Sequence, residues 1–259
     1  MSIKLKTNEE IVLLCEGGKR HAEILKLLSA MVSPGVSTLH LEESARRLVR
    51  EGGDQPAHLG YTPSGAKRPF PAVLCISIND EIVHGIPNED PKILKEGDII
   101  SLDLSIIHKG FFTDSAVTVP VGKIDKESMK LLEVTQEALR TGIASARPGR
   151  HIGDIGFAIS SVVEASGFSL AQDLVGHGVG YKLHEDPYVP NVGRRGEGEK
   201  LRVGMVIAIE PMVNIGKPGI KVLKDGYTIA TKDGSRSAHF EVTLAVGKDG
   251  PIVLTPIFW

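Results

Sequence analysis

The chain has 259 residues, and its 30 lysines and arginines nearly balance 32 aspartates and glutamates, for a formal net charge of −2. Without a basic stripe or a polybasic segment, this composition argues against binding to nucleic acid or to a membrane surface. Two cysteines, Cys15 and Cys75, are too few for a disulfide framework, and the first residues carry no signal-peptide pattern. We therefore expect a reduced, cytoplasmic protein that is long enough to bury a core.

The N-terminal stretch predicts two helices. Residues 7–31 place apolar side chains on one helical face and begin with the capping-box pattern of Thr7 and Glu10. A second amphipathic pattern covers residues 38–49 and is ended by a pair of glycines. The composition then predicts a loop over residues 60–71, a buried strand over 72–78 and another loop over 79–87.

The next two apolar runs predict a β-hairpin with paired acids. Residues 99–107 and 111–119 flank a break at His108 and Lys109, and a turn there would place Asp103 directly opposite Asp114. Two facing carboxylates inside an apolar sheet repel each other unless something positive lies between them. A single aspartate in a strand usually faces solvent, but this pair favours a cation site.

The remaining periodic segments predict both helices and strands. Helices are expected over 126–146 and 152–166, strands over 203–213 and 240–246, and a hairpin over 220–231 that turns at Asp225 and Gly226.

The two halves of the chain follow one plan. Residues 94–103 align without a gap with residues 201–210, so that Asp103 matches Glu210. Further along, the segment of Asp114 matches that of Glu241 in the same way. A repeat this long that occurs twice indicates a duplicated fold. We therefore expect one α+β domain over 1–259, with half-repeats at about 8–119 and 123–247.

Three histidines are weaker candidates when each is considered alone. His177 and His184 lie in a glycine-rich segment, residues 176–187, that is expected to be a loop, and His84 lies in a short turn. Surface histidines are common, so a structural role stays open for each of them. The glycines beside His177 allow a close backbone approach, which favours a functional role for that residue.

The charge of the four matched carboxylates decides whether they need a cation. If they converge, each like-charge pair at about 4 Å costs roughly 4 kcal/mol at an effective dielectric near 20. Several such pairs rival the roughly 5–15 kcal/mol by which a whole domain is stable. Two divalent cations would neutralise them, as in hydrolytic two-metal sites. One imidazole among oxygen ligands favours Mn, Fe(II) or Co over a thiolate-type zinc site, and calcium is disfavoured.

These residues carry a family pattern. The sequence resembles the type I methionine aminopeptidases, which have the pita-bread fold, along nearly its whole length. The motifs that carry the resemblance are Cys75-Ile-Ser-Ile-Asn, Val83-His84-Gly-Ile-Pro, Gly97-Asp-Ile-Ile-Ser-Leu-Asp103, Gly110-Phe-Phe-Thr-Asp114, Gly176-His177-Gly-Val-Gly, His184-Glu-Asp-Pro, Ile209-Glu210-Pro-Met212 and Ser237-Ala-His-Phe-Glu241.

The resemblance implies a dinuclear site and a reaction. Its metal ligands would be Asp103, Asp114, His177, Glu210 and Glu241, holding two divalent ions, which could be Co, Mn, Fe(II) or Zn. A metal-activated bridging water would attack the peptide, with Glu210 as general base and with His184 and His84 binding substrate and stabilising the intermediate. The expected product is the N-terminal methionine of nascent proteins and peptides with a small second residue. The candidate side-chain pocket comprises Tyr61, Phe70, Cys75, Met212 and Tyr227.

The chain departs from the family pattern at a few positions. The loop around residues 63–68 looks longer than in typical bacterial members. Tyr227, His239, Val242 and Leu183 replace the more frequent residues, and we expect them to touch the pocket wall rather than the metals.

Three alternatives stay open from the sequence. They are an Xaa-Pro aminopeptidase type of pita-bread enzyme, a non-catalytic pita-bread module that binds nascent chains or ribosomes, and a structural cation-binding protein. We expect a monomer that acts on nascent polypeptides near the ribosome exit. Because serine is small, the bond between Met1 and Ser2 of this chain is itself an expected substrate.

Overall fold

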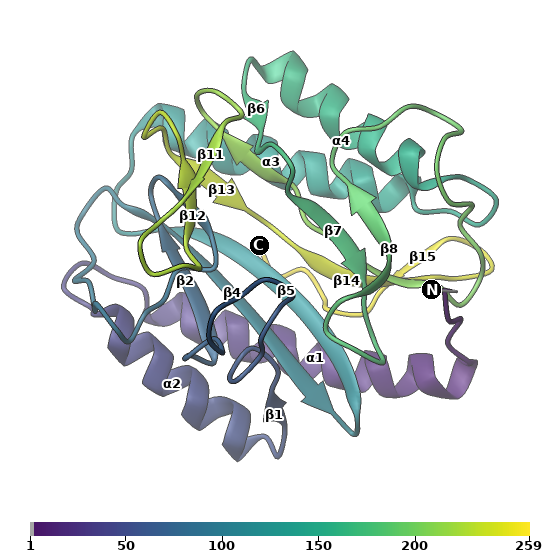
Figure 1. Cartoon of the computed structure of the whole chain (residues 1–259), viewed down its shortest axis with the longest axis horizontal. Helices are drawn as coiled ribbons and strands as arrows, with labels where there is room; N and C mark the ends of the chain where they lie inside the picture. Colours follow the sequence, from purple (N-terminus) through teal and green to yellow (C-terminus); the bar gives the residue numbers. More distant parts are fainter. Residues whose placement is uncertain (1–2) are drawn as a thin grey trace.

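The computed structural model describes residues 3–259, so the expected cleavage point between Met1 and Ser2 lies outside the described residues. Helices α1 and α2 lie along one side of the molecule and α3 and α4 along the other, with the strands between them (Figure 1). The helices and the antiparallel strand ladders are segregated, which confirms the α+β class. The helices are α1 (Asn8–Met31), α2 (Thr38–Glu51), α3 (Lys126–Ser145) and α4 (Ile152–Ser166).

The predicted start of α1 is confirmed. The Thr7 hydroxyl accepts a hydrogen bond from the Glu10 N–H at 3.3 Å, and the Glu10 carboxylate accepts one from the Thr7 N–H at 2.8 Å. This reciprocal pair satisfies two amide donors that the helix itself leaves free.

The central hairpin is present, but its register differs from the expected one. Strands β4 (Ile99–His108) and β5 (Phe111–Pro120) turn at Lys109 and Gly110, which have φ of +48° and +84°. Two residues with positive φ make the tight turn that suits the twist of a hairpin. Asp103 therefore faces Ala116, and Asp114 faces Ser105, so the predicted direct opposition of the two aspartates is wrong. They lie diagonally on the same face, still close enough to share a ligand.

Within residues 3–259 the strands form four antiparallel sheets, and the carboxylates lie in or next to strands of two of them. In the five-stranded sheet the order is β15-β14-β9-β7-β8, and β4 and β5 belong to a four-stranded sheet with β1 and β2. The strands are β1 (Gln55–Pro56), β2 (Leu74–Ile78), β3 (Glu81–Val83), β6 (Ser169–Leu170), β7 (Val175–Gly178), β8 (Glu185–Pro190), β9 (Val206–Ile209), β10 (Met212–Asn214), β11 (Ile220–Val222), β12 (Ile229–Thr231), β13 (Ser237–His239), β14 (Val242–Val246) and β15 (Pro251–Val253).

Some expected boundaries are wrong. The loop predicted over 79–87 contains β3, and the glycine-rich segment predicted as a loop contributes β7 and β8. The strand predicted over 203–213 is two strands, β9 and β10, interrupted at Glu210 and Pro211. Proline has no N–H to donate to a ladder, so the strand breaks where the carboxylate must turn out of the sheet.

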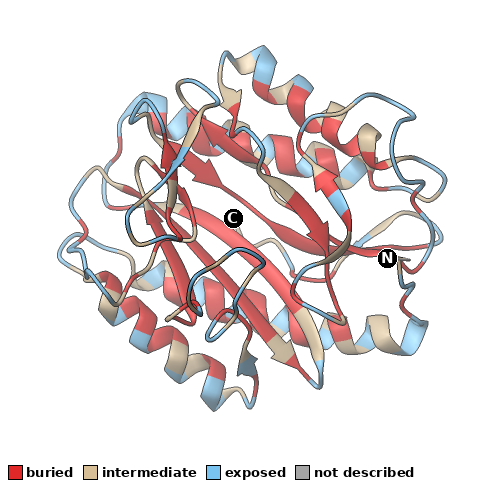
Figure 2. Ribbon diagram, viewed as in Figure 1, coloured by how far each residue is buried: buried red, intermediate tan, exposed pale blue. Residues whose placement is uncertain are grey.

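The two groups of strands meet where β5 lies beside β14. The Glu241 N–H donates to the Ala116 carbonyl at 2.9 Å. The Asp114 N–H donates to the Thr243 hydroxyl at 2.9 Å, and that hydroxyl donates to the Asp114 carbonyl at 2.7 Å. The strands are buried, and the exposed residues gather on the outer faces of the helices and in the loops (Figure 2). This junction holds the carboxylates on rigid, buried backbone.

Candidate metal centre

Four carboxylates and one imidazole converge at the junction of the sheets. Asp103, Asp114 and Glu241 each offer an oxygen atom, and these atoms lie within 4.8 Å of one another. His177 on β7 approaches from the other side, with its Nε2 3.7 Å from Asp114 Oδ2 and 3.4 Å from Glu210 Oε1. The five residues that the sequence singles out therefore lie together, although they come from five separate segments.

Burial makes the carboxylates difficult to ionise. Asp103, Asp114 and Glu241 are only 7%, 4% and 2% exposed. Burial raises the pKa of Asp114 to about 7, against the lowering effect of a hydrogen bond from Ser105. Burial and then the charge of Asp114 raise the pKa of Asp103 well above its usual range, and the pKa values of Glu210 and Glu241 are raised in the same way. The nearby like charges and the low polarity of the buried site both raise the pKa of a carboxyl group.

The donor set fits divalent cations. Asp103 Oδ1 and Glu241 Oε1 are buried and have no hydrogen-bond partner among residues 3–259. Within residues 3–259, the ion-pair contacts of these carboxylates are with histidines and not with lysine or arginine. A buried oxygen with no partner is costly, and a cation would satisfy it. Carboxylate oxygens with imidazole are ligands that Mn, Fe, Co and Zn accept.

The local backbone orients His177. Its Nδ1 lies 3.0 Å from the carbonyl oxygen of Gly178 and donates to it, which leaves Nε2 facing the carboxylates. Ligand histidines commonly use the second ring nitrogen in this way. A Cβ at Gly176 or Gly178 would overlap the carbonyl of Ala208 or of Asp186. These glycines thus allow the backbone of β7 to approach the neighbouring strands β8 and β9 closely.

His84 and His184 lie at the same cavity. His84 has φ of +59°, and a Cβ on the following Gly85 would overlap the Ile76 carbonyl, so this turn is tightly constrained. The His184 Nδ1 lies 2.8 Å from the Tyr61 hydroxyl, and its ring centroid lies 4.3 Å from that of His177. Burial lowers the pKa of both His84 and His184 to about 4, so both are neutral near pH 7.

One cavity of about 600 Å³ connects all of these groups. Pro63 and Ser64 of the 63–68 loop contribute to its lining. At the end of this loop, the Arg68 side chain pairs with Glu89, and the Arg68 backbone carbonyl accepts a hydrogen bond from the Tyr227 hydroxyl. These contacts attach the loop to the cavity rim. The side-chain pocket candidates from the sequence line the same cavity: Tyr61, Phe70, Cys75, Met212 and Tyr227.

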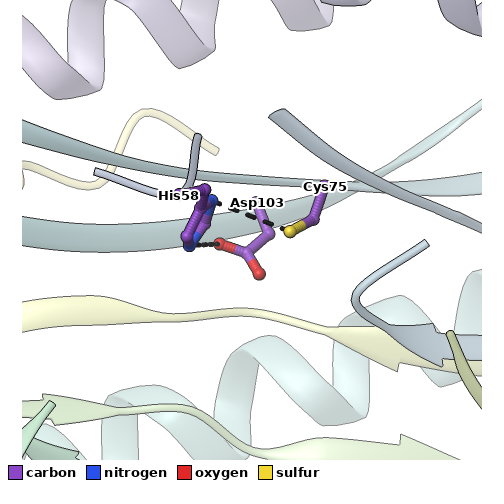
Figure 3. A group of neighbouring side chains, drawn as sticks. All are labelled: His58, Cys75 and Asp103. Atoms are coloured by element: carbon purple, nitrogen blue, oxygen red, sulfur yellow. Dashed lines mark hydrogen bonds and ion pairs between the residues drawn. The ribbon is translucent and has the colours of Figure 1, made fainter. Parts of the chain in front are cut away.

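Two histidines differ from the expectations. His239 lines the cavity, as expected. Its Nε2 also lies 3.6 Å from Glu210 Oε2 and 4.0 Å from Glu241 Oε2, so the expectation that it stays away from the metal ligands is wrong. It is 1% exposed, and both of its ring nitrogens lack a hydrogen-bond partner within the described part of the chain. His58, which the sequence does not single out, contacts both Cys75 and Asp103 (Figure 3). The only signal was one polar residue between Ala57 and Leu59.

Comparisons with known proteins agree with this geometry. Residues 13–248 match the model of metallopeptidase family M24. The chain is 46% identical to a methionine aminopeptidase of Aquifex aeolicus, over 99% of this chain and 100% of that protein. It is 40% identical to one of Escherichia coli, over 98% of this chain and 94% of that protein.

Solved structures of methionine aminopeptidases are also similar to this chain. A methionine aminopeptidase structure from Thermotoga maritima aligns with a TM-score of 0.94 and 39% identity, covering 99% of this chain and 100% of the other. A prolidase from Pyrococcus horikoshii is 21% identical with a TM-score of 0.75, over 98% of this chain and 64% of that one, which shows the fold alone. The expected pita-bread fold is confirmed.

Proposed function

The chain belongs to metallopeptidase family M24, and on that premise we propose that it is a methionyl aminopeptidase. It removes the N-terminal methionine from nascent proteins and peptides whose second residue is small. The observation that carries this proposal is a cluster of buried carboxylates and imidazole at a cavity whose adjoining wall is apolar. Such a cavity can hold an apolar side chain beside a hydrolytic centre.

Asp103, Asp114, His177, Glu210 and Glu241 would hold two divalent cations. When bound, such cations lower the pKa of water and polarise a carbonyl group. The predominance of oxygen donors favours Mn, Fe(II) or Co, and Zn also suits the imidazole.

Glu210 accepts and returns the proton in the reaction. It lies directly after β9, and its two oxygens face different histidines, with Oε1 3.4 Å from His177 and Oε2 3.6 Å from His239. A carboxylate with a raised pKa is a better proton acceptor than an ordinary one once it is ionised. Its position beside the other carboxylates supports this role, because the attacking water would bind among them.

His184 donates a hydrogen bond to the peptide through Nε2. Burial raises the pKa of Tyr61, so its hydroxyl keeps its proton and donates to His184 Nδ1 across 2.8 Å. In a neutral imidazole the other nitrogen then carries the hydrogen. A positioned donor of this kind stabilises the negative charge that develops on the carbonyl oxygen. His84, on the same cavity, acts as a second donor to the substrate backbone.

The apolar wall selects methionine. Phe70 packs edge-to-face on Tyr227 with ring centroids 5.2 Å apart, and Cys75 and Met212 complete this side of the cavity. A methionine thioether packs well against aromatic edges. The second residue of the substrate then lies beside the metal ligands, where only a small side chain leaves room for the scissile carbonyl.

We also propose where the protein acts. No helix within residues 3–259 is long and apolar enough to span a membrane. Its substrates are the N-termini of nascent chains near the ribosome exit in the cytoplasm, and it acts as a monomer.

A peptide panel tests the proposal. Release of the first residue is measured for Met-Ala-Ser, Ala-Ala-Ser, Met-Ser and Met-Lys peptides, and for Ala-Pro as the substrate of the Xaa-Pro alternative. We expect fast release from Met-Ala-Ser and Met-Ser. A single methyl-sized change in a pocket gives only about 10–200-fold discrimination, so exclusion of the long Met-Lys side chain should be larger. Preferential cleavage of Ala-Pro, or equal rates on Ala-Ala-Ser and Met-Ala-Ser, would overturn the proposal.

A further inference from the structure

His58 lies between the apolar wall of the cavity and the carboxylates, and no role follows for it from the proposed reaction. It is 8% exposed and packs edge-to-face on Phe70, with ring centroids 6.1 Å apart. Figure 3 shows its imidazole beside the side chains of Asp103 and Cys75. A buried imidazole at such a position needs partners for both of its nitrogens.

A chain of hydrogen bonds connects His58 to a carboxylate of the centre. The Ser105 hydroxyl, which is fully buried, donates to Asp114 Oδ1 at 2.6 Å. The same hydroxyl oxygen lies 2.7 Å from His58 Nε2. As a metal ligand Asp114 would be ionised and could only accept, so the single hydrogen of Ser105 is then committed to Asp114. The Ser105 oxygen must then accept from an N–H at His58 Nε2.

The other ring nitrogen is engaged as well. His58 Nδ1 lies 3.7 Å from Cys75 Sγ, within the range of a hydrogen bond to sulfur. With the hydrogen on Nε2, Nδ1 accepts from the Cys75 thiol. The direction of every bond in the series is thereby fixed: Cys75 to His58, His58 to Ser105, and Ser105 to Asp114.

We propose that His58 is a positioning residue that acts through Ser105 to orient the carboxylate of Asp114. With Oδ1 held by Ser105, the free oxygen Oδ2 faces His177 Nε2 at 3.7 Å, on the side where the cation binds. The proposal rests on the proposed function, because Asp114 is a metal ligand only there. Partners that orient metal ligands typically contribute about 10–100-fold to affinity or activity.

A second interpretation of the same group is a separate cation site. His58, Cys75 and Asp103 each have a possible ligand atom, and these atoms lie within 4.8 Å of one another. The hydrogen bonds oppose this interpretation, since both ring nitrogens of His58 already have partners. The number of ions bound separates the two interpretations.

The test is a double-mutant cycle on Mn²⁺ affinity, measured by calorimetry on metal-free protein. We expect His58→Phe, which keeps the ring but loses the donor, and Ser105→Ala each to weaken binding by about 10–100-fold. The double variant should bind no more weakly than Ser105→Ala, because His58 acts through that hydroxyl. His58→Gln, whose amide can donate from nearly the same place, should restore most of the affinity.

His21 supplies a matched control. It is a fully buried histidine whose Nδ1 lies 3.0 Å from the hydroxyl of Thr113, which is on β5 next to Asp114. His21→Phe should lower the denaturation midpoint but leave Mn²⁺ affinity within about twofold. Additive effects in the cycle, equal losses in the His21 and His58 variants, or no rescue by His58→Gln would each overturn the positioning role.

Two further results have distinct meanings. If His58→Phe removes one bound ion while the affinity of the others is unchanged, His58 is a ligand and the positioning role is wrong. If the wild-type protein binds no Mn²⁺, Co²⁺ or Zn²⁺, the proposed function fails and this inference fails with it. A wild-type protein that binds metal, with additive variants, would overturn the inference alone.

Discussion

Asp114 shows at the scale of one residue how burial prepares a cation site. It is 4% exposed, and burial raises its pKa to about 7 even though Ser105 donates a hydrogen bond to it. A cation would reverse this balance, because it stabilises the ionised form directly. The protonation of the carboxylates and the binding of metal are therefore linked.

The first prediction concerns pH and stability. A carboxyl group whose pKa is higher in the folded than in the unfolded state stabilises the fold while protonated, and this contribution is lost as the pH rises through the folded pKa. Burial lowers the pKa of His84, His177 and His184, so their effect on stability fades as the pH rises past the unfolded histidine value of about 6.5, and the carboxylates dominate from there upward. We expect the urea midpoint of metal-free protein to fall as the pH rises through about 7, where Asp114 titrates. Mn²⁺-loaded protein should lack this fall, and a midpoint that rises in the metal-free protein would contradict the prediction.

A second prediction separates the histidines from the ligands. His184→Ala should retain its bound metal but lose about 10²–10³-fold in kcat, as for other lost donors to a developing oxyanion. Tyr61→Phe, which removes only the group that orients His184 at 2.8 Å, should cost less. Metal content by mass spectrometry and kcat on Met-Ala-Ser report the two effects. Loss of metal from His184→Ala would make it a ligand instead.

The sequence predicts some of these residues better than others. Asp103, Asp114, Glu210 and Glu241 could be identified because the two half-repeats place an acid at matching positions in apolar strands. His58 could not be predicted, because its role depends on a contact with Ser105 that lies 47 positions away and only the folded chain creates.

At the scale of elements, strand breaks and tight turns direct side chains into the centre. Strand β9 ends at Ile209, and Pro211, which follows Glu210, keeps the strand from continuing. The turn at Lys109 and Gly110 sets the register of β4 against β5. The existence of this hairpin is predictable from two apolar runs and a break. Its register is not, because moving the turn by one residue changes every cross-strand partner while both arrangements leave the apolar pattern intact.

A third prediction tests the packing of β7. A Cβ at Gly178 would overlap the carbonyl of Asp186 on β8, so Gly178→Ala should destabilise the fold by about 1–3 kcal/mol, as overpacking typically does. Because the Gly178 carbonyl orients His177, metal affinity should also fall. Gly219→Ala is the control, since a Cβ there meets the Lys232 side chain at an ordinary 3.6 Å. Equal stability of the two variants in urea would contradict this account.

At the scale of the whole molecule, the centre exists because two sets of strands share one junction. Asp114 lies on β5, Glu241 lies directly before the adjoining β14, and hydrogen bonds of 2.7 Å and 2.9 Å connect Asp114 to Thr243. The arrangement of residues 1–259 as a single domain with two similar halves stays a prediction.

That prediction has a direct thermodynamic test. If the halves depend on each other for a core, calorimetry should show one transition whose calorimetric and van't Hoff enthalpies agree. Added Mn²⁺ should raise the midpoint without splitting the transition, since its ligands come from both sides of the junction. Two transitions, only one of which responds to metal, would mean that the halves fold as separate units.

The most direct test of the whole account is methionine release by metal-free protein as Mn²⁺ is added. We expect no release from Met-Ala-Ser without metal, and release that saturates with no more than two ions per chain. Glu241→Ala should abolish this response, because Glu241 reaches the oxygens of Asp103 and Asp114 as well as the group of His177 and Glu210. Full methionine release by protein that contains no metal would contradict the account.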